Sequence, residues 1–279
     1  MRLIESIFLV KNLLSRFSVS DDSRLNERAI GSLISARRAA AIDKAYFINQ
    51  VIDPVWLQDM GKINFTRVTS SDDPQILNSS LCLGKITLPP VVSLQTDRGV
   101  YRISSSSKQK QCYPISTEEF FFLYESDDDR LKQFSHYFRI GNAYYVYPYQ
   151  SEGSAILILA DPLQGFVKLT ENIASGSLTY GDTFIVLSGQ IVYGGTTYNP
   201  LQTFVAVQAS GNAYTGTGIV QYLNKKRKMT MYDEYPIAKN MESEIILSIL
   251  SSEFKIEAST LPDAINDARD NVQRQLQKK

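Results

Sequence analysis

The stretch VIDPVWLQDMGKINFTRV, residues 51–68, marks the point at which the apolar pattern changes its period. Asp53-Pro54 ends a region in which apolar residues recur every three or four positions, the spacing of one helix face. From Gly61 onward β-branched and aromatic residues alternate with polar ones, as in residues 63–68, which is the pattern of a strand. We therefore expect helices before this stretch and strands after it.

Two helices are expected in residues 1–60, which would form an N-terminal helical stem. The apolar stripe of the first comprises Leu3, Ile4, Ile7, Phe8, Leu14 and Phe17. The second is expected to open at residues 20–23, where short polar side chains can accept from its first amides. Its buried side is expected to comprise Leu25, Ala29, Ile30, Leu33, Ile34, Ala41 and Ala45. The alanine-rich centre, residues 36–41, would permit close packing, with Arg37 and Arg38 facing outward.

Residues 61–168 are expected to form an antiparallel β domain with short helices. Strand patterns occur at residues 85–88 and 99–103, and the polar run 104–111 predicts a surface loop. Residues 116–119 have the spacing of a capping box, which predicts a short helix through residues 120–124. Residues 143–148 and 155–159 are expected to pair as antiparallel strands across a polar turn at 150–154.

An inserted β-module is expected at residues 169–220, where glycine, threonine, tyrosine and serine dominate. Lysine and arginine are almost absent from this segment after Lys168. The expected strands, residues 183–187, 190–193 and 203–207, are separated by short glycine-containing or proline-containing turns. Turns of this length predict a meander.

Helical periodicity returns in residues 229–279. A helix is expected to begin at Tyr235-Pro236 and to bury Ile237, Met241, Ile245 and Ile249. A second, amphipathic helix is expected to start at residues 260–263, with the apolar stripe Leu261, Ile265, Ala268, Val272 and Leu276. Helices at both ends and strands between them predict an α+β fold. We expect the C-terminal helices to pack on the N-terminal stem as one bundle, with the antiparallel β domain in the centre.

The composition limits the classes of function. Lysine plus arginine equals aspartate plus glutamate at 29 each, so no overall field attracts nucleic acid or membrane. The best apolar run, residues 155–160, is far shorter than the roughly 18 residues that a membrane-spanning helix needs. Lys11 and Arg16 interrupt the apolar N-terminal segment, so a secretion signal is not expected. Cys82 and Cys112 are expected to be buried thiols, which favours a reducing compartment.

The residues typical of catalysis are sparse. His136 is the only histidine and lies among aromatic residues, so a packed or surface histidine is the expected interpretation. Residues 127–129, three aspartates, lack the alternating spacing of a calcium loop and predict a negative helix start. The Glu118-Glu119 pair does not indicate a glycosidase, and no phosphate-binding loop occurs. We therefore expect no enzyme, no cofactor and no metal; a hydrolase using His136 or paired carboxylates is the last-ranked alternative.

Two clusters remain as candidate contact sites. Lys225, Lys226, Arg227 and Lys228 form the one concentrated basic run, which could meet DNA phosphates or an acidic neighbouring subunit. A solvated loop is the other interpretation of this run. Among the tyrosines of residues 144–149, Tyr145, Tyr147 and Tyr149 are expected on one strand face, and Tyr144 on the other. Such a cluster could contact sugar or protein.

Several segments, taken in order, resemble the head-to-tail adaptor or portal-vertex ring proteins of short-tailed bacteriophages, particularly crAss-like phages. The resemblance covers most of the chain. The segments that carry it are ARRAAAIDKA (residues 36–45), WLQ (56–58), LGKITLP (83–89), GVYRI (99–103), GNAYYVY (141–147) and DEYPI (233–237). The glycine-rich segment VYGGTTY, residues 192–198, looks like a β-module that recurs in phage structural proteins, although an insert of this length departs from the minimal adaptor pattern.

This resemblance implies a virion structural protein with no catalytic residues. It would form a homo-oligomeric ring, expected to be twelvefold, that connects the portal to the tail and surrounds the DNA exit channel. The implied partners are copies of itself, the portal protein, other tail or ring proteins and the DNA that passes through, but no membrane. The implied location is the virion, after assembly in the bacterial cytoplasm. The alternative is a β-rich virion module that recognises carbohydrate or a host surface.

Overall fold

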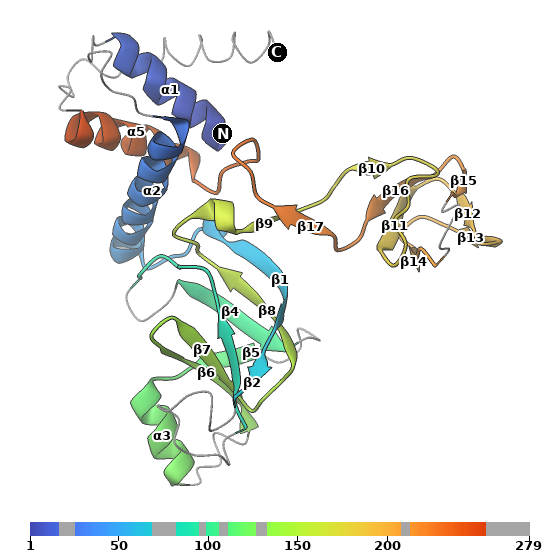
Figure 1. Ribbon diagram of the computed structural model, residues 1–279, viewed down its shortest axis with the longest axis horizontal. Coiled ribbons are helices and arrows are strands. Elements are labelled where there is room, and N and C mark those ends of the chain that lie inside the picture. Colours follow the sequence, from blue (N-terminus) through green and yellow to red (C-terminus); the bar gives the residue numbers. More distant parts are fainter. Residues whose placement is uncertain are drawn as a thin grey trace. The chain divides into compact units, whose positions relative to one another are not determined.

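The structure, a computed structural model, describes residues 1–16, 26–68, 82–94, 99–105, 111–126, 133–207 and 213–254 (Figure 1). The chain divides into two compact units. Unit 1 comprises Met1–Gly165 and Thr230–Lys279, and unit 2 comprises Phe166–Met229. Within the described ranges, four α-helices and a large, nearly closed sheet confirm the expected α+β class.

Three helices of unit 1 gather at one end of its sheet (Figure 1): α1 (Leu3–Arg16), α2 (Glu27–Asn49) and α5 (Lys239–Glu253). The expected start of α2 at residues 20–23 is wrong. Asn26 caps this helix, since its side-chain oxygen accepts from the amide of Ala29 at 2.8 Å, and asparagine is among the preferred caps. Residues 17–25 lie outside the described part.

The helix α5 begins three residues later than Pro236, so its expected start at Tyr235-Pro236 is also wrong. The backbone before α5 is engaged with the N-terminus, because the amide of Tyr235 donates to the carbonyl of Met1 at 3.0 Å. Arg2 and Glu234 form a β-bridge beside this contact. The stripe itself is confirmed for Met241, Ile245 and Ile249, which are buried.

Ion pairs join α2 to α5. Arg37 bonds with Glu253, and Lys44 lies 2.8 Å from Glu244. The expected helix after residue 260 lies outside the described residues. A bundle formed by all the terminal helices therefore stays a prediction. Among the residues that the structure describes, no helix combines the length and apolarity needed to cross a membrane.

The described sheet of unit 1 has eight strands in the order β1-β8-β4-β5-β6-β7-β3-β2. Their bounds are β1 (Gln58–Asn64), β2 (Thr66–Arg67), β3 (Gly84–Thr87), β4 (Val100–Ser105), β5 (Gln111–Pro114), β6 (Ser135–Ile140), β7 (Ala143–Tyr147) and β8 (Glu152–Leu157). The two edge strands, β1 and β2, are joined through Phe65 alone. Because the chain connects both edges directly, the sheet must curl until they meet.

The expected pairing of residues 143–148 with 155–159 is wrong. The strand β7 pairs with β6 and β3, whereas β8 pairs with β1 and β4. The physical reason is the two-residue turn Gly141-Asn142, where Gly141 has φ +59° and joins β6 to β7 as a hairpin. The strand β6 was not expected from the sequence, and it occupies the place assigned to β8.

Two separate apolar cores pack against the sheet. One contains Ile63, Phe65, Val100, Tyr144 and Leu157. The other lies beneath α3 (Thr117–Glu125), where Phe120 stacks on Phe138 with ring centroids 4.5 Å apart. The capping box predicted this helix correctly, since Ser116 accepts from the amide of Glu119 at 3.1 Å. Short 3-10 turns occur at η1 (Pro54–Trp56) and η3 (Pro162–Gln164).

Unit 2 contains the segment expected as a β-module, but with wider bounds. Its strands are β9 (Phe166–Lys168), β10 (Asn172–Ile173), β11 (Thr183–Ser188), β12 (Ile191–Tyr193), β13 (Thr196–Tyr198), β14 (Thr203–Val205), β15 (Thr215–Gly216), β16 (Ile219–Tyr222) and β17 (Lys226–Lys228). They form sheets ordered β10-β16-β11-β14 and β13-β12-β15, and the ribbon β17-β9. A core around Phe184, Val186, Ile191, Phe204 and Val220 lies within the unit.

The meander expected for this segment is wrong, because β11 and β12 belong to different sheets. A β-carbon on Gly189, which has φ +70°, would lie 2.9 Å from the Cα of Gly218. The chain therefore passes close to another backbone at this turn, and it leaves one sheet for the other instead of folding back as a hairpin.

Candidate functional site

The expected basic run lies on a two-stranded ribbon in unit 2. The strand β17 pairs antiparallel with β9, which places Lys226 opposite Lys168, Arg227 opposite Val167 and Lys228 opposite Phe166. Lys168 therefore joins the site from a strand 58 positions earlier in the sequence than Lys226. The sequence pattern missed Lys168 because a lone lysine carries no signal until the pairing of its strand is known.

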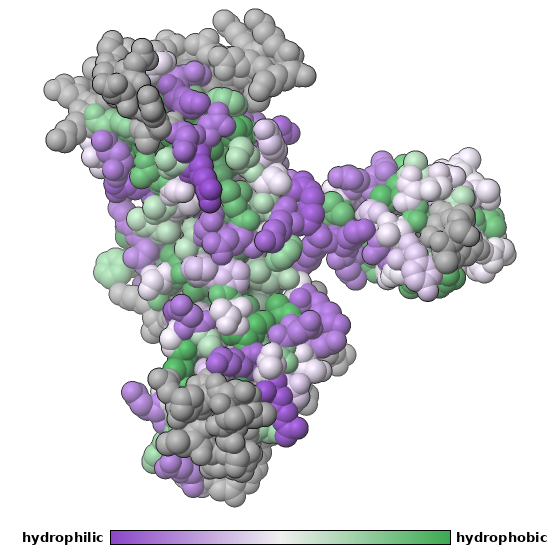
Figure 2. Space-filling view, viewed as in Figure 1, coloured by the Kyte–Doolittle hydropathy of each residue, from purple (hydrophilic) through white to green (hydrophobic). Residues whose placement is uncertain are grey.

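The ribbon concentrates positive charge on one face. Residues directly opposite in a ladder share a face, as do residues two apart in a strand. Lys168, Lys226 and Lys228 therefore lie on one face, and Arg227 lies on the other. Figure 2 shows this ribbon as a hydrophilic region beside the paler remainder of unit 2. A face that carries three lysines attracts anionic groups such as phosphates and carboxylates.

Lys225, the remaining residue of the basic run, is held within unit 2. Its ammonium group lies 2.8 Å from a carboxylate oxygen of Asp182 and 4.6 Å from the centroid of the Tyr222 ring. The hydrogen bond to Asp182 raises the pKa of Lys225. Because its charge is paired within unit 2, Lys225 is a weak candidate for an external contact.

Large apolar side chains are exposed at the C-terminal end of α2 and just beyond it. Phe47, Ile48, Val51 and Val55 lie within nine consecutive positions and are 64%, 66%, 65% and 48% exposed. Gln50, in the left-handed conformation with φ 53°, ends the helix between them. Single exposed apolar residues are ordinary, but a cluster of large ones is typical of a contact with another protein. We call these four residues the α2 end patch.

Arg38 is buried, which contradicts the expectation that both central arginines of α2 face outward. Its side chain is 0% exposed. Nε donates to the carbonyl of Pro236 at 2.7 Å, and Nη1 donates to that of Leu159 at 2.8 Å. Burial lowers the pKa of Arg38 to about 10. Arg37 keeps to the surface and bonds with Ser252 at 2.7 Å and with Glu253.

Arg38 thereby connects three parts of unit 1: α2, the end of the sheet after β8, and the segment before α5. Its guanidinium carbon lies 5.8 Å from the centroid of the Tyr235 ring. The hydroxyl of Tyr235 is 2.9 Å from that of Ser35. Burial raises the pKa of Tyr235. These contacts give the helices a defined position on the sheet.

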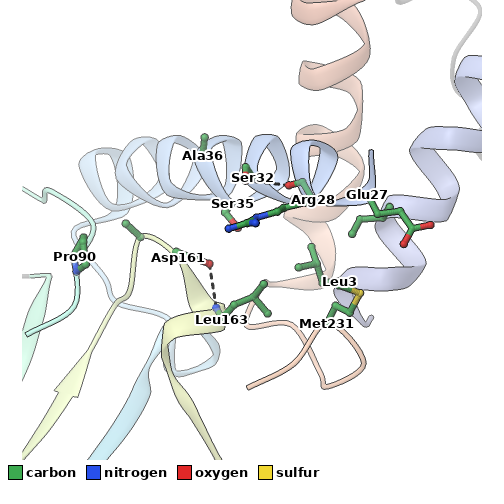
Figure 3. Close-up of a pocket in the computed structure, with 13 residues that line it drawn as sticks. Leu3, Glu27, Arg28, Ser32, Ser35, Ala36, Pro90, Asp161, Leu163 and Met231 are labelled. Atoms are coloured by element: carbon green, nitrogen blue, oxygen red, sulfur yellow. Dashed lines mark hydrogen bonds between the residues drawn. The ribbon is translucent and has the colours of Figure 1, made fainter. Parts of the chain in front are cut away.

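A cavity of about 640 Å³ lies beside this network, between α1, the first half of α2 and the loop after β8 (Figure 3). Figure 3 shows Arg28 extending beneath α2 toward Ser35, with Asp161 and Leu163 on the facing wall. Asp161 accepts from the amide of Leu163 at 3.1 Å. This volume is within the range of small-ligand sites, which run from about 300 to 1,000 Å³.

His136 lies in β6 opposite Tyr147 and is largely buried. Burial lowers its pKa, whereas a hydrogen bond with the backbone of Phe134 opposes that shift. Its Nδ1 is buried without a partner. In a catalytic triad this nitrogen donates to a carboxylate, and among the described residues it has no such partner.

Among the residues that the structure describes, the other candidates do not gather into a metal site. The aspartates 127–129 lie outside the described residues. Within the part of the chain that the structure describes, no three histidine, cysteine or acidic residues are placed to hold a metal ion. Both cysteines are free thiols, but Cys82 is only half-buried, which corrects the expectation that both are buried. Burial raises the pKa of the Cys112 thiol to about 11.

The expected grouping of three tyrosines on one face is also corrected. Tyr145 and Tyr147 pack with the aromatic core beneath α3. Tyr149 lies beyond the end of β7 and packs against the other core. The alternation of a strand no longer applies after β7 ends. These tyrosines serve mainly as core residues.

No family model matches the chain, and a search of curated proteins finds no match.

Proposed function

We propose that this chain is a virion structural subunit without chemistry of its own. Copies of it would form a twelvefold ring that connects the portal to the tail of a short-tailed phage and surrounds the channel through which DNA leaves. The ring would set the arrangement of the tail proteins to match that of the portal, and it would do so by subunit packing alone.

The observation that carries this proposal is the α2 end patch. A cyclic ring needs a heterologous contact, in which one surface of a subunit meets a different surface of its neighbour. Phe47, Ile48 and Val51, each about two-thirds exposed, supply the apolar part of one such surface. Burial of such side chains contributes about 1.5–3 kcal/mol each, which is enough for four of them to drive association.

The terminal helices would form the stem that holds this patch in place. We propose that residues 229–279 pack on residues 1–60 as one bundle, supported by the ion pairs of Arg37 with Glu253 and of Lys44 with Glu244. Arg38 supports the same arrangement, since it holds α2 to the sheet. A stem of fixed orientation would present identical patches around the ring.

The basic ribbon would meet DNA phosphates or an acidic neighbouring subunit. Lys168, Lys226 and Lys228 share one face, and phosphate contacts by lysine bind without sequence preference. The net charge of zero limits the attraction between DNA and the rest of the chain. DNA would therefore be guided at one place and could still slide through the channel.

Assembly with partners tests the proposal. The full chain is mixed with the portal and ring proteins of the same virion and examined by sedimentation velocity and negative-stain microscopy. Closed rings containing many copies of the chain are expected in at least one mixture, even if the isolated chain is a monomer. Complexes that contain a single copy in every mixture would contradict the proposal.

A second candidate function, recognition of carbohydrate or a host surface, rests on unit 2. Leu187, Val205 and Ile219 are exposed on the outward face of its four-stranded sheet. Between residues 169 and 218, only Glu171 and Asp182 carry charge. Figure 2 shows mostly pale and green residues on the visible surface of the unit away from its ribbon. Glycan-array binding by the full chain that disappears on deletion of residues 166–229 would favour this function.

A further inference from the structure

The cavity beside α2 combines walls from parts of unit 1 that are distant in sequence. Leu3 and Ile7 come from α1, Ser32 from α2, Leu163 from the loop after β8, and Met231 from the segment before α5. Four of these five side chains are apolar. Figure 3 shows Leu3, Leu163 and Met231 around an open space, with the guanidinium of Arg28 on one side. A ligand in this space would contact the helices and the sheet end together.

Of the described charged residues around the cavity, one cation has no counter-charge among the residues that the structure describes. Glu27 is paired with Lys11 at 3.2 Å. Asp161 accepts from the amide of Leu163 and lies close enough to Arg38 for their charges to interact. Among the described residues, Arg28 has neither a hydrogen-bond partner for its side chain nor an ion pair. The first turn of α2 adds the positive end of the helix dipole at the same place.

We propose that this cavity binds a segment of a neighbouring polypeptide in which an acidic residue lies beside large apolar ones. The carboxylate pairs with the guanidinium of Arg28, which suits bidentate recognition. The apolar side chains of the segment cover Leu163 and Met231, which are both partly exposed. This site is separate from the α2 end patch, and the inference holds whether or not the chain forms a ring.

The test uses two blocked pentapeptides with the central sequences Leu-Glu-Leu and Leu-Gln-Leu, which differ only in the charge of one side chain. The full chain carries methionines labelled with ¹³C at the methyl group. Met231 lines the cavity, whereas Met241 lies buried in α5 and is the internal control. We expect the Glu peptide to shift the Met231 signal and to bind about fivefold more tightly than the Gln peptide, the range of a partly exposed ion pair.

Two variants make the result specific. Arg28→Gln should abolish the preference for the Glu peptide and leave the weaker binding of the Gln peptide unchanged. Ser32→Leu should block both peptides, because Ser32 lines the cavity and is exposed, so a larger side chain fills the space without disturbing the core. Lys239→Gln removes one exposed positive charge elsewhere and should change nothing.

Three results would overturn the inference. They are equal affinity for both peptides, a preference that survives Arg28→Gln, and shifts of Met241 as large as those of Met231. A fourth arm distinguishes a small-molecule ligand. If 4-phenylbutanoate shifts Met231 at concentrations at which neither peptide does, the cavity takes a free carboxylate and the polypeptide partner is excluded.

Discussion

The guanidinium of Arg38 donates to the carbonyl of Leu159 at 2.8 Å, although the two residues are 121 positions apart in the sequence. Nε of the same side chain donates to Pro236, near the other end of the chain. One buried residue of α2 therefore holds the sheet end and the entry to α5. A buried charge is stable only when it is hydrogen-bonded, so the three segments must stay together.

Replacement of Arg38 by methionine should destabilise unit 1 by about 2–4 kcal/mol, because one buried and one partly buried carbonyl lose their donor. Arg37→Met, at the adjacent position, removes only half-exposed contacts with Ser252 and Glu253 and should cost less than about 1 kcal/mol. Urea denaturation of both variants measures the difference. Equal losses of stability would contradict the role assigned to Arg38.

The basic ribbon predicts a salt-dependent affinity for double-stranded DNA. The variant with Lys168, Lys226 and Lys228 all changed to glutamine should lower the slope of log K against log salt by about 0.9 for each phosphate that is no longer neutralised. Fluorescence anisotropy with a short duplex measures this slope. A control with Lys44, Lys62 and Lys239 changed to glutamine removes the same charge from unit 1. Equal slopes for the two triple variants would argue against the ribbon as the site.

The α2 end patch predicts a variant that folds but does not associate. Phe47→Ser combined with Ile48→Ser should weaken subunit association by about 3 kcal/mol, roughly 100-fold, while the melting temperature stays unchanged because both residues are exposed. Phe122→Ser, which replaces an equally exposed aromatic residue on α3, is the matched control. Sedimentation of assembled mixtures compares the two, and a stronger effect of the Phe122 variant would place the contact elsewhere.

The two cysteines should differ in reactivity. Cys112 is buried and its pKa is raised to about 11, so almost no thiolate is present at neutral pH. Cys82 is half-buried. A colorimetric thiol reagent should therefore modify Cys82 in the native chain and Cys112 only after denaturation. The variants Cys82→Ala and Cys112→Ala identify each reaction, and rapid modification of native Cys112 would show that its surroundings open readily.

His136 should make stability depend on pH in the acidic range. Burial lowers its pKa in the folded chain, whereas the unfolded chain binds a proton below a pH of about 6.5. The unfolded state therefore gains protons first, and stability falls as the pH drops below about 6.5. Urea midpoints at about pH 7.5 and 5.5 measure the loss. His136→Phe should show a smaller loss than the native chain, and an identical loss would exclude this contribution.

Local sequence patterns predicted where helices lie better than they predicted which strands pair. The stripe at four-residue spacing predicted α5 because helical contacts are local, and the capping box predicted α3 because a cap involves only neighbouring residues. The pairing of β7 with β6 was not predicted. It depends on a hairpin at Gly141 whose first strand carries the unexpected sequence SHYFRI, residues 135–140.

Arg38 lies on a helix face that the sequence pattern does mark. Ile30, Ile34, Ile42 and Tyr46 are buried, and Arg38 occupies the missing position in their four-residue spacing. The helix period alone therefore places Arg38 on the buried face. The carbonyls that satisfy it are far away in the sequence, so no local pattern reveals why a charge is tolerated there.

The same difference between local pattern and long-range pairing holds for the candidate site. The basic run was visible as four consecutive charges, yet its ion pair with Asp182 and its extension to Lys168 depend on strand pairing. The α2 end patch was not predicted, since Phe47 and Ile48 continue the apolar character of the helix. Only their exposure separates them from core residues.

Rotational symmetry in averaged cryo-electron microscopy images tests the central claim most directly. Particles assembled from the chain and its virion partners should show a closed ring, with the residues of the α2 end patch covered by the adjacent subunit. A chain that stays in single copy beside those partners, with Phe47 and Ile48 open to solvent, would contradict the account.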